Sequence, residues 1–352
     1  MNLKFFKNKK ILVTGASGFK GAWLSFMLHI LSAKVYGLGI KPNLNEKLFN
    51  QIKLKKKITF KYINITDKNR LKKYIHKIKP SIIFHLAAQP ILSESYKYPF
   101  KTIVTNSIGT LNLLDICKEL KFVKSIVCIT SDKCYKNNYS TTGFKEDDKL
   151  GGEDPYSASK ACSEIIAESY YKSFYKKKKI GLATTRAGNV IGGGDWSPNR
   201  LVPDCINWLM NKEIIKIRRP NFNRPWQHVL DPLYGYIKLS YELYKKPEKY
   251  SGSWNFGSKK GNIISVKNIV KIIIKYWGNG RYKILNKKLF YEQENLQLNI
   301  QKSNKILKWF PKYSIKESLA TTVEWYKFVY LNGTKSAESI TKKQILSYFK
   351  KK

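Results

Sequence analysis

The feature that most restricts the fold of this chain is a short apolar strand that runs directly into a glycine-rich turn. The apolar run Lys10 to Val13 is followed by Gly15, Gly18 and Gly21, and an apolar pattern with helical spacing begins near Phe19. Glycines allow the backbone to approach a pyrophosphate, while a helix N-terminus supplies N–H donors and a positive dipole. A plain tight turn is the alternative, but the position between a strand and a helix favours a dinucleotide cradle.

Strand and helix patterns alternate along the first half of the chain. After the first strand, apolar strand candidates recur at Ala33 to Leu38, Ser81 to His85, Ser125 to Thr130 and Ile180 to Thr185. This alternation predicts an α/β fold, a Rossmann-type doubly wound parallel sheet with helices on both faces. Ligand groups of such sheets gather at the C-terminal ends of the strands, so the residues that follow each strand are candidates for a site.

The pattern changes after Arg186, where a passage rich in Gly, Asn and Pro runs from Gly188 to Arg200. We expect residues 1–186 to form a Rossmann domain that binds NAD, and residues 187–352 to form predominantly a smaller C-terminal substrate domain. The chain is expected to return to the sheet near residues 225–258, at Gln227 to Leu230 and Trp254 to Gly257. Two helices are expected after that, at Val266 to Trp277 and Ile315 to Leu331. We expect the basic C-terminal segment Thr341 to Lys352 to be a fraying helix.

Tyr156 and Lys160 are the candidate catalytic pair. They lie four residues apart on an expected helix, so both side chains project from the same face and the ammonium stabilises a phenolate. With the hydroxyl of Ser131 to orient a substrate alcohol, Tyr156 can take the alcohol's proton while hydride leaves the same carbon. A solvated helix face is the alternative, but the stretch Tyr170 to Lys176 has similar spacing without an accompanying Ser-Asp-Lys strand end.

Asp132 and Lys133 follow Ser131 directly and add a second acid and a candidate second base. Simple alcohol oxidation requires neither of these groups, whereas a reaction with further proton transfers, such as elimination of water, does. The segment therefore favours an elimination reaction over a simple oxidation.

The end of the second strand is unusual for a site that binds NAD. An acid is expected there to bind the adenosine ribose, but Gly39 or Ile40 stands in its place and Lys41 follows. The sequence therefore predicts a nicotinamide dinucleotide and leaves the choice between NAD and NADP open.

The net charge of +42 attracts phosphate in general, which makes a protein that binds nucleic acid or another polyanion an alternative. The excess is nearly all Lys and is spread over the whole chain, so we interpret it as a compositional bias. Arginine is local instead, because five of the seven fall within one span: Arg186, Arg200, Arg218, Arg219 and Arg224. Since the guanidinium fork binds a diphosphate in a bidentate manner, we expect a nucleotide-linked substrate there, with surface ion pairs as the alternative.

The cellular location follows from what the sequence lacks. No apolar run approaches the length of a membrane span, and the first strand begins too early to leave room for a signal peptide. The five cysteines show no metal or disulfide spacing. We expect no metal site, no membrane association and a cytoplasmic location.

Together these motifs resemble the extended short-chain dehydrogenases/reductases and, among them, the CDP-glucose 4,6-dehydratases. The resemblance runs nearly end to end, through Thr14 to Leu24, His85 to Pro90, Thr130 to Tyr135, Gly151 to Lys160, Arg186 to Trp196 and Arg224 to Val229. The Asp132-Lys133 pair is the most specific part, because related dehydratases carry Asp-Glu or a single Glu there and the sugar 4-epimerases lack the pair.

The resemblance implies a homodimer that uses NAD and CDP-glucose, without a specific nucleic acid partner, in the synthesis of deoxysugar precursors of surface polysaccharides. The catalytic residues implied are Ser131, Asp132, Lys133, Tyr156 and Lys160. The cofactor-binding residues implied are Gly15, Ser17, Gly18, Phe19, Lys20, Gly21, Asn64, Ile65, Leu86, Ala87, Ala88, Gln89 and Asn106, together with Tyr156 and Lys160. The substrate-binding residues implied for the C-terminal, nucleotide-sugar domain are Gln89, Asn189, Arg200, Leu201, Arg219, Arg224, Trp226 and His228.

The implied reaction begins with oxidation of C4 of the hexose, with Tyr156 as base, Lys160 lowering its pKa and Ser131 holding O4. Lys133 removes the acidified C5 proton, or instead orients water or the C6 oxygen, while Asp132 donates a proton to the departing C6 hydroxyl. Hydride then returns to C6 and gives CDP-4-keto-6-deoxy-D-glucose. Another nucleotide-sugar 4,6-dehydratase or a nucleotide-sugar 4-epimerase is the nearer alternative, and a polyanion-binding protein without turnover is the more distant one.

Overall fold

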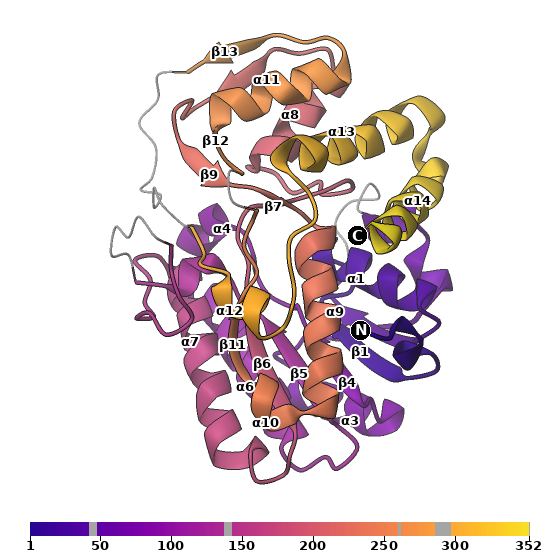
Figure 1. Ribbon diagram of the computed structural model, residues 1–352, viewed down its shortest axis with the longest axis vertical. Coiled ribbons are helices and arrows are strands. Elements are labelled where there is room, and N and C mark those ends of the chain that lie inside the picture. The colour runs from indigo at the N-terminus through magenta and orange to yellow at the C-terminus, as the bar shows by residue number, and fades with distance from the viewer. Residues whose placement is uncertain (42–47, 137–142, 260–261, 286–296, 352) are drawn as a thin grey trace.

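The computed structural model describes residues 1–41, 48–136, 143–259, 262–285 and 297–351, and a seven-stranded sheet forms its centre (Figure 1). The strands are β1 (Lys10–Thr14), β2 (Lys34–Gly39), β3 (Thr59–Tyr62), β4 (Ile82–His85), β5 (Ser125–Ile129), β6 (Gly181–Arg186) and β11 (Gly252–Asn255). Their order is β11-β6-β5-β4-β1-β2-β3, and every neighbouring pair is parallel. The α/β, Rossmann-type doubly wound fold is therefore confirmed.

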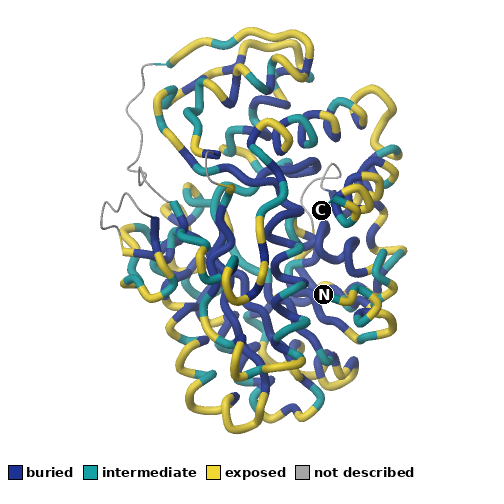
Figure 2. Tube along the Cα trace, in the orientation of Figure 1, coloured by how far each residue is buried: buried dark blue, intermediate teal, exposed yellow. Residues whose placement is uncertain are grey.

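Residues along each central strand alternate between two apolar cores, one on each face of the sheet. In β1, Ile11 and Val13 belong to the larger core, whereas Leu12 belongs to the smaller one. In β4, Phe84 and Ile83 divide in the same way. Figure 2 shows these strands as the most continuously buried part of the chain.

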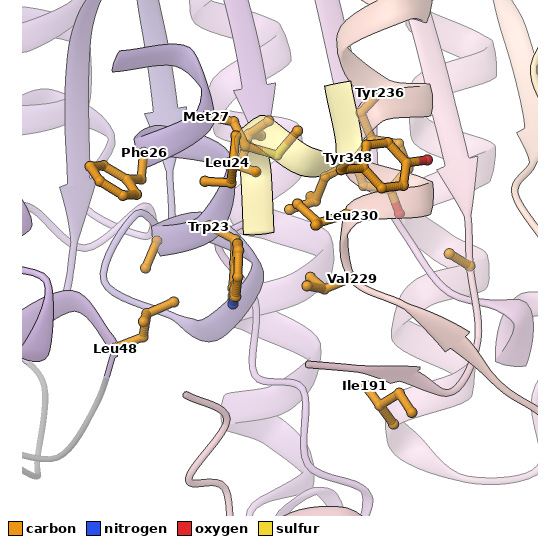
Figure 3. Packing of buried hydrophobic residues seen from close by; sticks show 14 of the residues in the cluster. Trp23, Leu24, Phe26, Met27, Leu48, Ile191, Val229, Leu230, Tyr236 and Tyr348 are labelled. Carbon is orange, nitrogen blue, oxygen red and sulfur yellow. The ribbon is translucent and has the colours of Figure 1, made fainter. Parts of the chain in front are cut away.

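The helices cover both faces of the sheet. The smaller core is closed by α3 (Lys68–Ile78), α6 (Gly109–Cys117) and α7 (Pro155–Tyr170), and the larger core by α1 (Phe19–Ile30) and α9 (Leu230–Lys245). Trp23, Leu24 and Met27 of α1 face Leu230 of α9 in the larger core (Figure 3). The shorter helices around the sheet are α2 (Leu48–Gln51), α4 (Leu92–Lys97), α5 (Pro99–Ile103), the π-helical turn η3 (Val104–Ile108), the 3-10 turn η4 (Asp132–Cys134), α10 (Pro247–Tyr250) and α12 (Gln301–Lys305).

The remaining elements form a smaller body at the C-terminal ends of the strands, at the top of Figure 1. It contains α8 (Leu201–Met210), α11 (Val266–Trp277) and α13 (Ile315–Asn332), with the strand pairs β8 (Ile215–Ile217) and β13 (Tyr282–Ile284), and β9 (Asn223–Pro225) and β12 (Ile263–Ser265). The expected helix Val266 to Trp277 is confirmed, since Ser265 caps its N-terminus and Gly278 ends it at φ +109°. The expected helix from Ile315 is confirmed by the Ser314–Glu317 capping box.

Two expectations for the second half were wrong in detail. Gln227 to Leu230 does not join the large sheet; β10 (Gln227–His228) pairs instead with β7 (Val190–Ile191). The C-terminal tail does not fray, because α14 (Ala337–Lys350) buries Ile345 and Tyr348. The Tyr348 hydroxyl donates to Asp231 Oδ1 at 2.7 Å and thereby attaches the tail to the beginning of α9.

The strand order places the ligand crevice. Successive strands run outward in one direction from β1 through β2 to β3, and in the other direction from β4 through β5 to β6. In open parallel sheets, ligands bind where the order reverses, at the C-terminal ends of the strands. Here that point lies between Thr14 of β1 and His85 of β4, which are aligned in register.

Candidate active site

A cavity of about 340 Å³ opens at this point of the sheet. Its walls come from the glycine turn after β1, the ends of β2, β4 and β5, the start of α7, and the passage Gly194 to Arg200 that leads into the smaller body. Segments far apart in the sequence therefore share one pocket, as expected for a site that holds a cofactor and a substrate together.

The glycine turn is packed so tightly that larger residues would not fit. Gly15 has φ +70°, and a Cβ at this position would lie 2.7 Å from the backbone nitrogen of Ala87. A Cβ at Gly21 would lie 2.0 Å from the carbonyl oxygen of Gly15. Since α1 begins directly after Gly18 and its first residues line the cavity, the N-terminus of the helix lies at the cavity wall and the turn suits a dinucleotide pyrophosphate.

Residues 34–41, the described part of the chain at the end of β2, place no carboxylate at the cavity. Gly39, Ile40 and Lys41 line it, and the Ser17 hydroxyl donates to the Ile40 carbonyl oxygen at 3.0 Å. A Cβ at Gly39 would lie 2.6 Å from the Ser17 oxygen, so the glycine leaves room for this bond. Ser17 therefore joins the turn to β2 at the place where an acid was expected.

Helix α7 carries Tyr156 and Lys160 into the cavity wall. Asp154 caps the helix by accepting from the Ser157 amide at 2.9 Å, and Pro155 occupies its first turn. This local start places Tyr156 at the second helical position and Lys160 one turn later. Both are buried, and the Lys160 ammonium donates to the Ile129 carbonyl oxygen at 3.2 Å.

Burial has the largest effect on the pKa of both Tyr156 and Lys160. It raises the pKa of Tyr156 to about 12, although a hydrogen bond with Ser131 acts in the opposite direction. Burial also lowers the pKa of Lys160 to about 8. The loss of hydration outweighs the favourable contacts of the phenol, and the expected effect of Lys160 on the pKa of Tyr156 stays a prediction.

Ser131 and Asp132 lie together at the end of β5. The Ser131 hydroxyl donates to Asp132 Oδ1 at 3.0 Å and accepts from the Lys133 amide at 3.2 Å. Asp132 is 4% exposed, and it packs so closely on Gly188 that a Cβ there would lie 1.7 Å from Oδ2. Ser131 and Asp132 both lie close enough to the phenol of Tyr156 to affect its pKa, while Lys133 follows in the turn η4 and is half-buried.

Most residues of the expected cofactor set line the cavity. These are Gly15, Ser17, Gly18, Phe19, Lys20, Gly21, Asn64, Ile65, Leu86, Ala87, Ala88, Tyr156 and Lys160. The Lys20 side chain lies near Arg200 and Lys160, and burial followed by these two cations lowers its pKa to about 8. The fit of the turn and the position of the paired Tyr and Lys suit a nicotinamide dinucleotide.

Two residues of that set lie behind the wall. The Gln89 amide nitrogen donates to Ile91 O and Thr102 Oγ1, both at 3.0 Å, so its side chain is used within the loop. Asn106 is 1% exposed, and its amide holds the backbone of Gln89 from both sides. In this conformation both side chains shape the wall and do not face a ligand.

The arginines of the span lie in different environments: one lines the cavity, and another is buried in the core. Arg200 lines the cavity, where its guanidinium pairs with Asp195 at 2.9 Å. Arg186, which was counted in the span but not among the expected substrate residues, is instead buried in an ion pair with Glu164 at 2.7 Å. Its position on β6, among the core residues of the sheet, explains the difference.

The other expected substrate residues lie beyond the cavity. Leu201 begins α8 directly after Arg200, and Asn189 has φ 42° and a buried amide nitrogen without a partner among the described residues. Arg219 and Arg224 flank the ring of Phe222, at 4.6 and 5.4 Å from its centroid.

Trp226 and His228 are buried beneath this region. His228 has no exposed surface and packs its ring between Trp23 and Tyr313. It cannot contact a ligand in this conformation and is a core residue.

The expected site residues did not include three polar or aromatic residues of the wall, Asp195, Trp196 and Ser197. Asp195 is buried, and its carbonyl oxygen accepts from the Tyr326 hydroxyl of α13 at 2.5 Å. The run Gly192 to Gly194 before them was the available signal, because a Cβ at Gly193 would lie 2.0 Å from the Trp325 ring. That run requires close packing of the passage against α13 and so brings its next residues to the cavity.

Comparison with known proteins shows the family to which the chain belongs. The sequence model of the family described as GDP-mannose 4,6 dehydratase matches residues 12–322. A CDP-glucose 4,6-dehydratase of Salmonella typhimurium is 40% identical over 329 residues, which cover 92% of each chain. A UDP-glucuronate 4-epimerase of Thermodesulfobacterium geofontis is 28% identical, over 90% of this chain and 95% of the relative.

Solved structures agree on the fold. A dTDP-glucose 4,6-dehydratase from Bacillus anthracis, determined in complex with NAD, superposes with a TM-score of 0.75 at 25% identity and covers 91% of this chain and 97% of its own. An epimerase from Methanothermobacter thermautotrophicus superposes with a TM-score of 0.80 at 22% identity, over 94% and 95% of the two chains.

Proposed function

This chain belongs to the GDP-mannose 4,6-dehydratase family, and we propose that it is a CDP-glucose 4,6-dehydratase, an NAD-dependent hydro-lyase that converts CDP-D-glucose to CDP-4-keto-6-deoxy-D-glucose. The observation that carries the proposal is that Tyr156, Ser131 and Asp132 lie together at the end of β5, with the Ser131 hydroxyl donating to Asp132 Oδ1. Oxidation of an alcohol uses the first two groups, whereas the buried carboxylate beside them adds an acid for a leaving hydroxyl. NAD supplies the reversible hydride acceptance that makes the reaction an internal redox exchange.

The first half of the proposed reaction takes place at C4 of the hexose. Ser131 orients the C4 hydroxyl, and Tyr156 removes its proton as the C–H bond breaks. Because burial raises the pKa of Tyr156 to about 12, the phenol becomes an effective base only when positive charge lies close to it. Lys160 is fixed one helical turn away by its bond to the Ile129 carbonyl, so it is the candidate for that charge.

The second half takes place at C5 and C6. The ketone at C4 acidifies the C5 proton, and we assign its removal to Lys133, with orientation of water or of the C6 oxygen as its other role. Asp132 donates a proton to the departing C6 hydroxyl. Its fixed position against Gly188 keeps the acid at one place relative to Ser131.

The substrate diphosphate is assigned to the side of the cavity toward the smaller body. Arg200 is the arginine of the sequence span that reaches the cavity wall, and the Arg219–Phe222–Arg224 stack lies in the same body. A guanidinium presents two parallel donors to a phosphate oxygen pair. Residues 1–186 with β11 would then hold NAD, and most of 187–352 the nucleotide sugar.

We propose a homodimer formed through the helices that pack against α7. Exposed apolar side chains lie on α7 and on two segments that pack against it, α5 and η3: Ile165 is 55%, Phe100 81% and Ile108 41% exposed. A second copy of the same surface would bury them. A Phe100→Asp variant should be monomeric in light scattering at a concentration where the wild type has twice its mass; equal masses would contradict this dimer.

We also place the reaction in a reducing compartment, the cytoplasm. All five cysteines are free thiols, four of them buried, and the thiols are expected to stay reduced there. Across the described ranges, no helix is both long enough and apolar enough to cross a membrane.

The test of the function is a substrate panel. Pure protein is incubated with NAD and, separately, CDP-glucose, dTDP-glucose and GDP-mannose, and the products are identified by mass and NMR. The proposal expects a 4-keto-6-deoxy product from CDP-glucose in preference to the other two. A 4-epimer that keeps its C6 hydroxyl would instead identify a nucleotide-sugar 4-epimerase, the second candidate, which the 28% identical UDP-glucuronate 4-epimerase keeps open.

A further inference from the structure

His85 is a buried histidine beside the cavity to which the proposed reaction assigns no role. It is the last residue of β4, 3% exposed, and it stands directly before Leu86, Ala87 and Ala88 of the cavity wall. Its two ring nitrogens contact two threonine hydroxyls, Thr14 Oγ1 at 2.8 Å from Nδ1 and Thr110 Oγ1 at 3.1 Å from Nε2. The ring therefore bridges the end of β1 and the first turn of α6.

The partners of the two threonines determine where the ring proton lies. Thr110 Oγ1 lies 2.6 Å from the Asn106 carbonyl oxygen, which can only accept, so the Thr110 proton is used in that bond. Thr110 must then accept from His85, and the proton is on Nε2. Nδ1 is left as an acceptor, so Thr14 donates to it while accepting from the Ala87 amide at 3.1 Å. Every donor in the series has one acceptor.

One end of this series holds the cofactor side of the cavity. Thr14 is the residue before Gly15, and its oxygen fixes the amide of Ala87. That amide nitrogen is the atom that a Cβ at Gly15 would meet at 2.7 Å. The distance between the glycine turn and the end of β4 therefore depends on the Thr14 hydroxyl and on the acceptor that orients it.

The other end reaches the helix that carries Tyr156 and Lys160. Asn106, whose carbonyl accepts from Thr110, donates through its amide to Ser159 Oγ at 2.8 Å. The Ser159 hydroxyl donates to the Tyr156 carbonyl oxygen at 2.7 Å. Asn106 lies in the π-helical turn η3, a deviation from α-helical geometry that often accompanies functional sites.

The charge state of His85 agrees with this geometry. Burial, followed by the nearby Lys160 ammonium, lowers its pKa to about 3. A protonated ring would direct an N–H from Nδ1 at the Thr14 hydroxyl, which would then have to stop donating to the ring. The series persists only while the ring is neutral.

We propose that His85 is a positioning residue that joins the dinucleotide cradle to the helix carrying Tyr156 and Lys160, and that it does so in the neutral Nε2–H form that the partners of the two threonines require. It acts through Thr14 on the cradle and through Thr110 and Asn106 on the helix. The expected effect of His85 on turnover rests on the proposed function. The position of its ring proton and its effect on dinucleotide binding are independent of that function.

The first test reads the proton directly. Nitrogen NMR of protein labelled at its four histidines, with the His85 signal identified by its loss in a His85→Asn variant, distinguishes the two neutral forms and the charged ring. We expect the Nε2–H form, unchanged between about pH 5 and 8. A proton on Nδ1, or a titration within that range, would overturn the proposal.

The second test separates the two ends of the series. In His85→Asn the amide oxygen takes the place of Nδ1 near Thr14, and in His85→Gln the amide nitrogen takes the place of Nε2 near Thr110. We expect the Asn variant to keep its NAD affinity, measured by calorimetry without substrate, and to lose about tenfold in turnover; the Gln variant should lose about tenfold in NAD affinity and keep its turnover at saturating NAD. Equal losses of both quantities in both variants, or no loss in either, would contradict it.

A matched pair of threonine variants controls for general destabilisation. Thr110 and Thr322 are both buried helical threonines whose hydroxyls donate to the carbonyl four residues earlier, at 2.6 and 2.7 Å. Both Val variants should unfold at lowered temperatures, Thr110→Val at least as much as Thr322→Val because it also removes the acceptor of His85 Nε2–H, but Thr110→Val alone should change the NMR signal of His85 and reduce turnover. An equal effect of Thr322→Val on turnover would make the role of His85 merely structural. If the wild type makes no 4-keto-6-deoxy sugar, the NMR and NAD-binding results still decide the positioning role.

Discussion

Replacement of Gly188 by Ala tests the place of Asp132 without removing any functional group. A Cβ at residue 188 would lie 1.7 Å from Asp132 Oδ2 and 2.4 Å from its Cγ, whereas ordinary contact begins near 3.4 Å. The carboxylate must therefore retreat by more than about 1 Å, and a misplacement of that size costs about 10²-fold in rate. Gly188 does not have a positive φ, so alanine introduces no backbone strain of its own.

The assay measures the two halves of the reaction separately. Reduction of NAD in a single turnover with CDP-glucose reports the oxidation at C4, and the 4-keto-6-deoxy product, identified by mass, reports the elimination. We expect Gly188→Ala to keep most of the first rate and to lose about 10²-fold in the second. The melting temperature of the variant checks that the fold persists.

A double-mutant cycle shows whether the loss passes through Asp132. In an Asp132→Ala background the carboxylate that meets the new methyl group is gone, so Gly188→Ala should add little to the loss already present. A wild-type product rate in Gly188→Ala, or the same fold-loss with and without the carboxylate, would refute the assignment of Asp132 as the acid.

Further outcomes follow from the same geometry. Tyr156→Phe should lower oxidation by about 10²–10⁴-fold with the fold unchanged, because only the phenolic oxygen is lost; a near wild-type rate of NAD reduction would remove Tyr156 as the base. Arg200→Lys should weaken CDP-glucose binding about tenfold in calorimetry and NAD binding less, since an ammonium cannot replace the guanidinium fork; equal affinities would make Arg200 a structural partner of Asp195. Burial raises the pKa of Asp231 to about 6 from 3.8, so the folded state holds the proton more tightly, and this stabilisation is complete below about pH 4 and lost as the pH rises through about 6. Relative to Asp231→Asn, the wild type should therefore lose up to about 3 kcal/mol of unfolding free energy between pH 4 and 7, and parallel pH profiles would contradict it.

The sequence was most informative where a local requirement has one structural solution. The strand–glycine–helix unit is such a case, because Gly15 and Gly21 leave no room for a side chain. The period of the apolar residues likewise identified α11 to the residue. The sequence did not predict strand β3, because this strand is short, lies at the edge of the sheet and buries mainly Phe60.

The sequence was least informative about what a charged or polar side chain faces. The sequence does not distinguish Arg186 from Arg200, since both belong to the same arginine-rich span. In the structure Arg186 is paired with Glu164 in the core, whereas Arg200 lines the cavity. His228 was expected at the substrate and lies instead among aromatic rings. Such differences depend on segments that meet only after folding, and residue type and spacing do not contain them.

The C-terminal helix makes the same point for packing. Its basic residues suggested a fraying tail, whereas α14 is attached by Tyr348 to Asp231 and by Thr341 to Trp325, whose indole donates to the threonine hydroxyl at 2.8 Å. The partners lie on α9 and α13, and the sequence around residue 341 contains no pattern that predicts these contacts.

The central claim is that hydrogen moves from C4 to C6 of one hexose while water leaves. The direct measurement uses CDP-glucose that carries deuterium at C4, with the product analysed by NMR and mass. The account predicts a 4-keto sugar whose C6 is a methyl group carrying the deuterium, formed with loss of one water. Deuterium returned to C4 of a sugar that keeps its C6 hydroxyl would contradict it and would identify the protein as an epimerase.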